Sequence, residues 1–314
     1  MKNFGKVMLV IGMVIGSGFA SGKEIAVFFS RFGCFSYIFI PFVFFLFWGV
    51  FFWILSHGEG GIDKLNSSKI FLSLYTTISL VFTASMFAGT KVTMFFENHF
   101  IDITLMVVLL LTCIYVSRTG IKVLEIFNAY LIPITIIILV ICLKKNIGHE
   151  LASFKGSFSL GFMFSILYVV MNVSTSSFVM GQMGKDMTKK EIFLVSFLSS
   201  LILSLLLFFI NFVILSNSES LNYSMPLLQV SNGAVYILMR IVVFVGCLTT
   251  LLSLVYTTSK NLSKLGVAGI FNVFISVIFP FSLSFLGFGK IVAYVYPVVS
   301  VIGICLWIPF FKSK

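Results

Sequence analysis

The feature that most constrains this chain is a succession of ten apolar stretches, most of them longer than twenty residues, joined by short polar connections. A bilayer core about 30 Å thick needs about 20 apolar residues per helix. With soft edges, the stretches are residues 4–30, 36–57, 69–92, 100–117, 121–143, 157–184, 190–216, 233–261, 265–286 and 288–311. Their runs are unbroken, whereas the strands of a membrane β-barrel alternate. We therefore predict an all-α integral membrane protein with ten transmembrane helices in a single domain, residues 1–314.

The composition agrees with a chain that is solvated by lipid. Hydrophobic residues make up 59% of the sequence and charged residues only 10%, whereas about 25% of the residues in a soluble domain are charged. This argues against a soluble enzyme, a disordered chain and a nucleic-acid module. The net charge of +11 comes from Lys and Arg in short segments between apolar runs, so we expect the lipid bilayer, and no nucleic acid, as a partner.

The distribution of basic residues predicts the orientation. If the N-terminus is cytoplasmic, 13 of the 21 Lys and Arg residues fall in the inside loops and tails. Cytoplasmic loops of membrane proteins carry an excess of these residues. The bias therefore favours both termini inside.

A cluster of small residues interrupts the first stretch. Gly12, Gly16, Gly18 and Gly22 lie in a span that should otherwise be helical, and each glycine lowers helix stability by about 1 kcal/mol relative to alanine. Unwound backbone survives at membrane depth only where it is buried in protein or lines a cavity. We predict a broken first helix, with close helix packing through small residues as the alternative.

The sixth stretch contains a polar run, Asn172 to Ser177, whose side chains compete with the helix for backbone hydrogen bonds. This predicts a second break, again with helix packing as the alternative. A Gly-Lys-acid tripeptide begins at both Gly22 and Gly184. Five spans per half give the halves opposite orientations, so we predict inverted repeats over residues 4–143 and 157–311. Paired interrupted segments in such repeats indicate the binding site of a secondary transporter.

The string from Val14 to Phe19, Val-Ile-Gly-Ser-Gly-Phe, resembles the first-helix signature of the amino acid–polyamine–organocation superfamily. The longer string from Gly16 to Ile25, with Phe28, Phe29 and 31–33, is similar to the YkvI family of bacterial membrane proteins. The resemblance implies a LeuT-like fold, a 5+5 inverted repeat with broken helices 1 and 6, in the bacterial cytoplasmic membrane.

The resemblance also implies a substrate site at the two breaks. A substrate carboxylate would meet freed amides of the first segment, and a substrate ammonium would meet freed carbonyls of both segments. The residues implied are Gly16, Ser17, Gly18, Phe19, Ala20, Ser21, Asn172, Ser174 and Thr175. The ligand expected there is a small amino acid or a related zwitterion.

The eighth stretch is similar to the eighth helix of sodium-coupled LeuT-like transporters, although Cys247 shifts the spacing by one residue. The resemblance implies ion ligands at Gly12, Ile15, Thr249, Thr250 and Ser253. The alternative is that these hydroxyls donate to carbonyls of their own helix. Asn128 could open the backbone beside this site.

Few ionisable residues fall inside the stretches. Lys23 and Glu24 follow the first break and either pair with each other or line an outer vestibule. No carboxylate lies at the middle of a stretch, which favours sodium coupling or uncoupled exchange over proton coupling. We expect no cofactor, because Na⁺ or H⁺ would act only as a coupling ion.

No catalytic triad, Walker loop or HExxH motif is present in the sequence, so we expect no enzyme. The sequence predicts a secondary transporter of an amino-acid-like solute that works by alternating access. The alternative is a ligand-sensing subunit on the same scaffold that carries no flux.

Overall fold

The computed structural model describes residues 2–66, 69–94, 99–118, 121–148 and 156–312, all of them helical or in connections between helices. The longer helices are α1 (Lys2–Val14), α4 (Ser36–Asn66), α5 (Lys69–Thr93), α6 (His99–Arg118), α7 (Ile121–Lys145), α8 (Phe158–Gly184), α9 (Lys189–Ser216), α11 (Gly233–Lys264) and α15 (Tyr296–Lys312). The short α-helices are α2 (Ser17–Ala20), α3 (Lys23–Phe28), α10 (Pro226–Gln229), α12 (Gly269–Val273), α13 (Phe279–Leu283) and α14 (Phe288–Lys290). Turns of 3-10 or π helix lie at η1 (Ser30–Phe32), η2 (Ser218–Asn222), η3 (Phe274–Ile278), η4 (Ser284–Leu286) and η5 (Ile291–Val295).

Within the described residues, seven helical segments are long and apolar enough to cross a membrane: Ser36–His57, Lys69–Thr93, Lys122–Lys145, Phe158–Gly184, Lys189–Leu215, Gly233–Lys264 and Gly269–Leu286. Three more apolar helices are shorter: Asn3–Val14, Ile103–Tyr115 and Phe288–Ile304. The prediction of an all-α, multi-span membrane protein is confirmed. Ile103–Tyr115 and Phe288–Ile304 lie within the predicted stretches 100–117 and 288–311, and Asn3–Val14 begins one residue before the predicted stretch 4–30.

Local sequence signals explain where some helices begin. At the start of α9, the Thr188 hydroxyl accepts from the Glu191 amide at 3.3 Å, and the Glu191 carboxylate accepts from the Thr188 amide at 2.8 Å. This capping box satisfies two amides that a helix N-terminus leaves without partners. The Ser157 hydroxyl caps α8 in a similar way, by accepting from the Leu160 amide.

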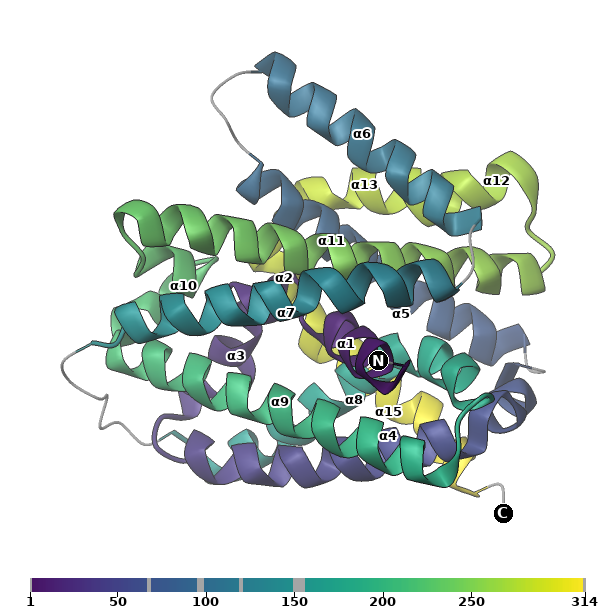
Figure 1. The fold of residues 1–314 in the computed structure, drawn as a ribbon, viewed down its shortest axis with the longest axis horizontal. Helices are drawn as coiled ribbons and strands as arrows, with labels where there is room; N and C mark the ends of the chain where they lie inside the picture. Colours follow the sequence, from purple (N-terminus) through teal and green to yellow (C-terminus); the bar gives the residue numbers. More distant parts are fainter. Residues whose placement is uncertain (1, 67–68, 95–98, 119–120, 149–155, 313–314) are drawn as a thin grey trace.

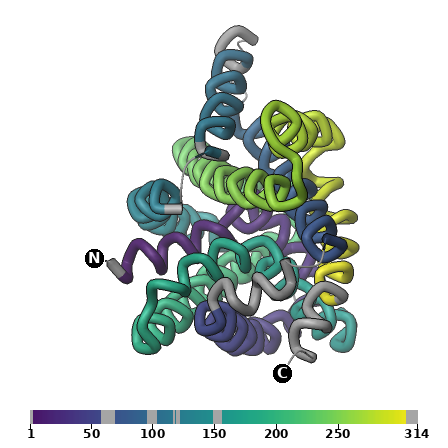
Figure 2. The backbone as a smooth tube through the Cα atoms, turned by 90° about the vertical axis from the view of Figure 1, so that its right-hand side faces the viewer, coloured from purple at the N-terminus to yellow at the C-terminus, as the bar shows by residue number. Residues whose placement is uncertain are grey.

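The helices differ in how deeply they are enclosed. For α8, 72% of the membrane-length window is buried inside the protein, whereas for α7 the share is 33%. Helix α1 lies inside the bundle, between α11 and α7 on one side and α9 on the other (Figures 1 and 2). Helix α6 lies at the periphery (Figure 1). The centre of the molecule is therefore built by α8 and the broken first segment.

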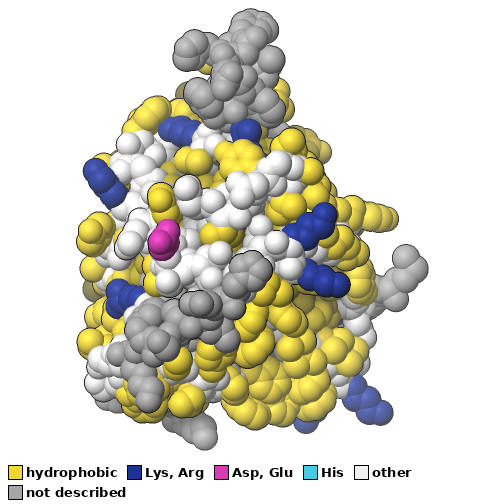
Figure 3. Space-filling model, turned by 90° about the vertical axis from the view of Figure 1, so that its left-hand side faces the viewer, with side chains coloured by type: hydrophobic (Ala, Val, Ile, Leu, Met, Phe, Trp, Pro, Cys, Tyr) yellow, Lys and Arg dark blue, Asp and Glu magenta, His cyan; other side chains and the backbone are white. Residues whose placement is uncertain are grey.

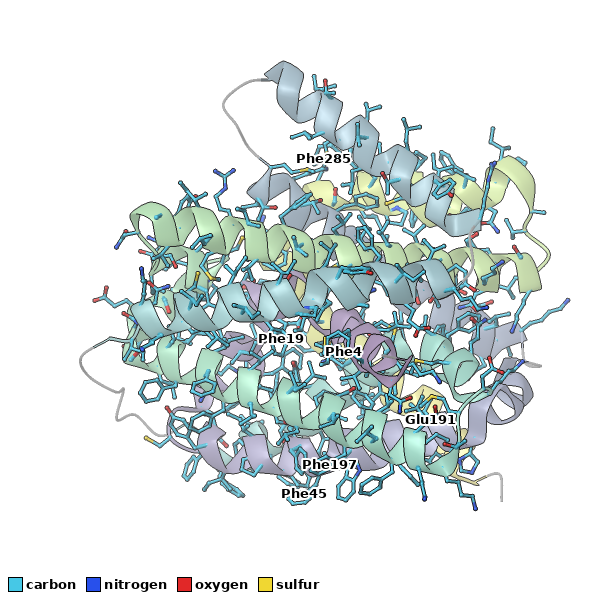
Figure 4. The ribbon with its side chains drawn as sticks, in the orientation of Figure 1. Phe4, Phe19, Phe45, Glu191, Phe197 and Phe285 are labelled. Carbon is cyan, nitrogen blue, oxygen red and sulfur yellow. The ribbon has the colours of Figure 1, made fainter. Side chains whose placement is uncertain are left out.

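The outward faces of the helices are strongly apolar. Exposed side chains include Leu111, Tyr130, Ile137, Phe271 and Tyr294, each 60–75% exposed. Phe45 and Phe197 lie at the outer edge of α4 and α9 (Figure 4). Figure 3 views the molecule from the left of Figure 1 and shows apolar side chains around a more polar area with scattered Lys and Arg. Apolar exposure on this scale indicates a surface that lipid covers.

One prediction about the fold is wrong: α8 runs without interruption from Phe158 to Gly184, so the sixth stretch is not broken. Its polar side chains bond to the helix itself. The Thr175 and Ser176 hydroxyls both donate to the Asn172 carbonyl, at 2.9 and 2.8 Å. Hydroxyls that bond backward in this way are compatible with a continuous helix, which is why the polar run does not unwind it.

Candidate binding site at the broken first segment

The first segment is interrupted between α1 and α3. After Val14 the backbone becomes extended at Gly16, with φ −91° and ψ −167°, and the Gly16 amide donates to the Val14 carbonyl at 2.8 Å. One turn of helix, α2, follows. The chain turns again at Gly22, whose φ of 79° lies in the left-handed region that favours glycine. The predicted break in the first segment is therefore confirmed.

The groups freed by the break are satisfied by neighbouring elements. The Gly12 carbonyl accepts from the Thr250 hydroxyl of α11 at 2.9 Å. The Ser17 amide and hydroxyl donate to the sulfur of Met86 on α5, at 3.4 and 3.5 Å. The Ser21 carbonyl accepts from the Leu227 amide of α10 at 3.0 Å. The break is thus buried in protein, which is the condition under which irregular backbone persists at membrane depth.

Two glycines on neighbouring helices allow this close packing. A Cβ added to Gly89 of α5 would lie 2.7 Å from the Ser17 Cβ and 2.8 Å from the Cys247 sulfur. A Cβ added to Gly246 of α11 would lie 3.0 Å from the Ile15 carbonyl oxygen. Small residues therefore bring α5 and α11 against the unwound backbone.

The predicted substrate residues fall into two groups. The residues of the first group, Gly16, Ser17, Gly18, Phe19, Ala20 and Ser21, are all buried at the break. Phe19 is fully buried and lies near the centre of the molecule (Figure 4). Whether they bind a substrate stays a prediction.

The second group lies on α8 and does not share one face. The Ser174 side chain packs close to Gly303 of α15. The Tyr75 hydroxyl of α5 lies 3.5 Å from the Thr175 carbonyl. Asn172 instead lies beside the Tyr168 hydroxyl. The three α8 residues therefore have different neighbours.

The predicted ion ligands are partly brought together. Thr250 joins Gly12, as described, whereas the Thr249 and Ser253 hydroxyls donate within α11, to the carbonyls of Gly246 at 3.2 Å and Thr249 at 3.0 Å. The Asn128 side chain of α7 packs against Gly12, where an added Cβ would overlap its Oδ1. This oxygen is buried and has no hydrogen-bond partner in the described part of the chain.

Glu24 lies deeper in the protein than the sequence predicted, since a pair with Lys23 or a place in an outer vestibule was expected. It is 3% exposed, and its carboxylate packs against Gly18, where an added Cβ would overlap Oε1. It does not pair with Lys23, whose ammonium donates to the carbonyls of Tyr223 at 2.8 Å and Leu221 at 3.4 Å. The carboxylate therefore belongs to the interior, beside the break. Its position in the first apolar stretch was the available signal, because charged groups inside spans are costly and mark functional sites.

Two phenols accompany this carboxylate. Tyr168 of α8 and Tyr296 of α15 are fully buried, and both interact electrostatically with Glu24. Their elements agree, because α3 packs against α8 and against η5, which leads into α15. Ser85 of α5 lies beside the Tyr296 hydroxyl. We call Glu24, Tyr168, Tyr296 and Ser85 the central oxygen cluster.

A separate cavity of about 360 Å³ lies between α5, α6 and α11. Its lining is mostly apolar and contains Thr93, Met94, Leu105, Ile237, Arg240, Ile241 and Phe244. None of the predicted site residues lines it.

Comparison with known proteins adds a distant relative. No protein-family model matches the chain. The uncharacterized protein YyaD of Bacillus subtilis (strain 168) is 25% identical over 323 aligned positions, which cover 96% of this chain and 93% of YyaD. The chain is therefore similar to a protein of nearly the same extent, and this likeness assigns no family and no activity.

Proposed function

We propose that the chain is a secondary transporter that moves a small amino acid or a related zwitterion by alternating access across the bacterial cytoplasmic membrane. The observation that carries this proposal is the buried break at residues 15–22. A chain gains nothing in stability from unwinding a helix inside a membrane, and such breaks are a common way to build substrate and ion sites in transporters.

The architecture in this proposal is LeuT-like. The seven membrane-length segments and the three shorter apolar helices would supply ten crossings, arranged as two inverted halves with both termini cytoplasmic. The first segment would supply the interrupted helix. In this form of the proposal α8 lines the site as a continuous helix.

Sodium coupling is proposed at the junction of α1 and α11. Three oxygens support it: the Gly12 carbonyl, the Thr250 hydroxyl and the unpartnered Oδ1 of Asn128. A hard cation prefers oxygen ligands of this kind.

A ligand sensor without flux is the second candidate. It is favoured by the continuous α8 and by the Met86 sulfur, which occupies the Ser17 amide. Uptake of a mixture of labelled amino acids into proteoliposomes separates the two candidates. Accumulation that depends on the protein supports a transporter, and ligand-induced thermal stabilisation without uptake supports a sensor.

A substitution in the break tests the location of the site. Gly16→Val places a branched side chain where a Cβ already lies 3.0 Å from Met86 Cε and 3.4 Å from the Thr250 hydroxyl. Overpacking of this kind typically costs about 1–3 kcal/mol, so uptake should fall about tenfold or more with normal expression. The control is Gly49→Val on α4, where an added Cβ meets nothing within 4 Å. Normal uptake by Gly16→Val would place the pathway elsewhere.

A further inference from the structure

The central oxygen cluster has hydrogen-bonding capacity that the described residues leave unused. Glu24 Oε2 and the hydroxyls of Tyr168, Tyr296 and Ser85 are buried, and within the described residues none of them forms a hydrogen bond of standard geometry. The Tyr296 and Ser85 hydroxyls lie beside each other, and Asn172 lies beside the Tyr168 hydroxyl. Buried polar groups are nearly always partnered, because leaving one without a partner costs free energy comparable to a lost hydrogen bond. Four such atoms from four elements, α3, α8, α15 and α5, indicate a place that a ligand completes.

A cationic ligand would favour the ionised form of Glu24, because a nearby opposite charge stabilises a carboxylate. Within the described residues no Lys or Arg forms an ion pair with Glu24, since the adjacent Lys23 binds the carbonyls at the end of η2. An ionised carboxylate only accepts hydrogen bonds, and hydroxyls can accept as well as donate. The complementary ligand is therefore positively charged and rich in hydrogen-bond donors.

The surroundings of the oxygens are aromatic. Phe28, Phe29 and Phe47 have ring centroids 5.7, 5.0 and 5.9 Å from that of Tyr168. Phe82 stacks on Tyr296 with centroids 4.3 Å apart. Hard metal ions such as Mg²⁺ and Ca²⁺ take six or more oxygen ligands, whereas ring faces attract organic cations and accommodate their hydrocarbon parts. These aromatic surroundings favour binding of an organic ammonium group over binding of a metal ion.

We propose that Glu24 and the hydroxyls of Tyr168, Tyr296 and Ser85 form the binding site for an ammonium group of the substrate. The three N–H donors of a primary ammonium match one carboxylate and a set of hydroxyl oxygens. Gly18 takes part through its missing Cβ, because a side chain there would displace the carboxylate. The substrate class is thereby a primary amine with an apolar or aromatic portion, including amino acids that carry one.

Binding can be measured without flux. Calling the ligand a substrate rests on the proposed function. The test of the site itself needs only binding of the ligand by the protein in nanodiscs. The probes are n-butylammonium and phenylethylammonium chloride, with n-butanol, butyrate and sodium chloride as matched comparisons. We expect the unfolding temperature to rise with the ammonium probes and to stay unchanged with the alcohol and the carboxylate. A rise with sodium chloride, which the proposed ion site at Thr250 would give, should be the same in the wild type and in Glu24→Gln.

Substitution assigns the effect to the cluster. Glu24→Gln keeps the size of the side chain and removes its charge, so it should weaken binding of the ammonium probes about tenfold to a hundredfold, the range for a charge-assisted hydrogen bond. Tyr296→Phe keeps the ring and should weaken binding by a smaller factor, which provides a second readout if Glu24→Gln does not fold. The control is Glu219→Gln in η2, which removes the same charge from an exposed position.

The outcomes separate this inference from the transport proposal. The ammonium site is excluded if no ammonium probe stabilises the wild type, or if the probes stabilise Glu24→Gln and Tyr296→Phe as much as the wild type. It is also excluded if sodium alone gives the stabilisation that depends on Glu24. Glu24-dependent binding without uptake in proteoliposomes leaves the ammonium site standing and removes the transporter. If the wild type takes up amino acids and neither Glu24→Gln nor Tyr296→Phe changes this uptake, the transport proposal is supported and the ammonium site is excluded.

Discussion

Thr250 shows how one residue can serve the helix break and a candidate ion site together. Its hydroxyl leaves its own helix and donates to the Gly12 carbonyl at 2.9 Å, whereas Thr249 and Ser253 nearby donate within α11. Ser or Thr hydroxyls in membrane helices usually take that local bond. The exception at Thr250 coincides with the point where the Gly16 amide no longer reaches back to Gly12.

Replacing Thr250 separates the two roles. Thr250→Val leaves the Gly12 carbonyl buried without this donor, which should lower stability by about 1–3 kcal/mol and remove any sodium-dependent stabilisation. Thr250→Ser keeps the hydroxyl and should restore both properties. Thermal unfolding in nanodiscs with sodium or choline chloride is the measurement, and Thr77→Val, at an exposed position on α5, is the control. Equal sodium responses in wild type and Thr250→Val would exclude an ion site that uses this hydroxyl.

At the scale of elements, α8 is a continuous helix that a neighbour contacts at its polar run. The Tyr75 hydroxyl of α5 accepts from the Ser177 hydroxyl at 3.2 Å and from the Phe178 amide at 3.3 Å. A side chain that bonds to helix backbone in this way competes with the i to i−4 hydrogen bonds of the helix and weakens them locally. We therefore expect weaker backbone hydrogen bonding at this point of a helix that is otherwise continuous.

Tyr75→Phe tests this contact. Removing the hydroxyl should lower stability by about 1 kcal/mol and change the rate of amide hydrogen exchange at residues 175–179, while exchange in α9 stays as in the wild type. Hydrogen exchange followed by mass spectrometry of peptides from α8 is the measurement. Unchanged amide hydrogen exchange in α8 would mean that Tyr75 does not affect the backbone hydrogen bonds of that helix.

At the scale of the whole molecule, the exterior is strongly apolar, and the interior is a mainly apolar core that contains buried polar side chains. Large side chains such as Ile134, at 55% exposure, face outward on α7, while Asn128 and Thr135 on the same helix are buried. This polarity predicts which faces contact lipid. It also leaves the interior with enough hydroxyl and amide groups to hold a polar ligand.

A charge on the outer face of α7 tests the embedding. Ile134→Arg places a guanidinium near the middle of the segment Lys122–Lys145, where insertion scales assign about 2.5–3.5 kcal/mol to an arginine. The protein should be lost from the membrane fraction or be recovered at a much lower level. Lys144→Arg, at the end of the same segment, should have no effect. Equal recovery of the two variants would argue against lipid at this face.

The apolar runs predicted the helices well, since each run needs only local sequence to specify its structure. The first break was also readable, because the clustered glycines lower helix stability whatever surrounds them. The second break was not, because Thr175 and Ser176 satisfy their hydroxyls inside the helix. The central oxygen cluster was out of reach for another reason: Glu24 meets Tyr168 and Tyr296 through packing between distant parts of the chain, and no local pattern encodes that meeting.

The tethering of α3 has a mechanical consequence. The ammonium of Lys23 is bound to the carbonyls at the end of η2, and the Ser21 carbonyl is bound to the first turn of α10. These two attachments couple the segment after the break to residues 221–227, which are more than 190 positions away in sequence. If the segment after the break moves to admit a solute, the connection between α9 and α11 has to move with it.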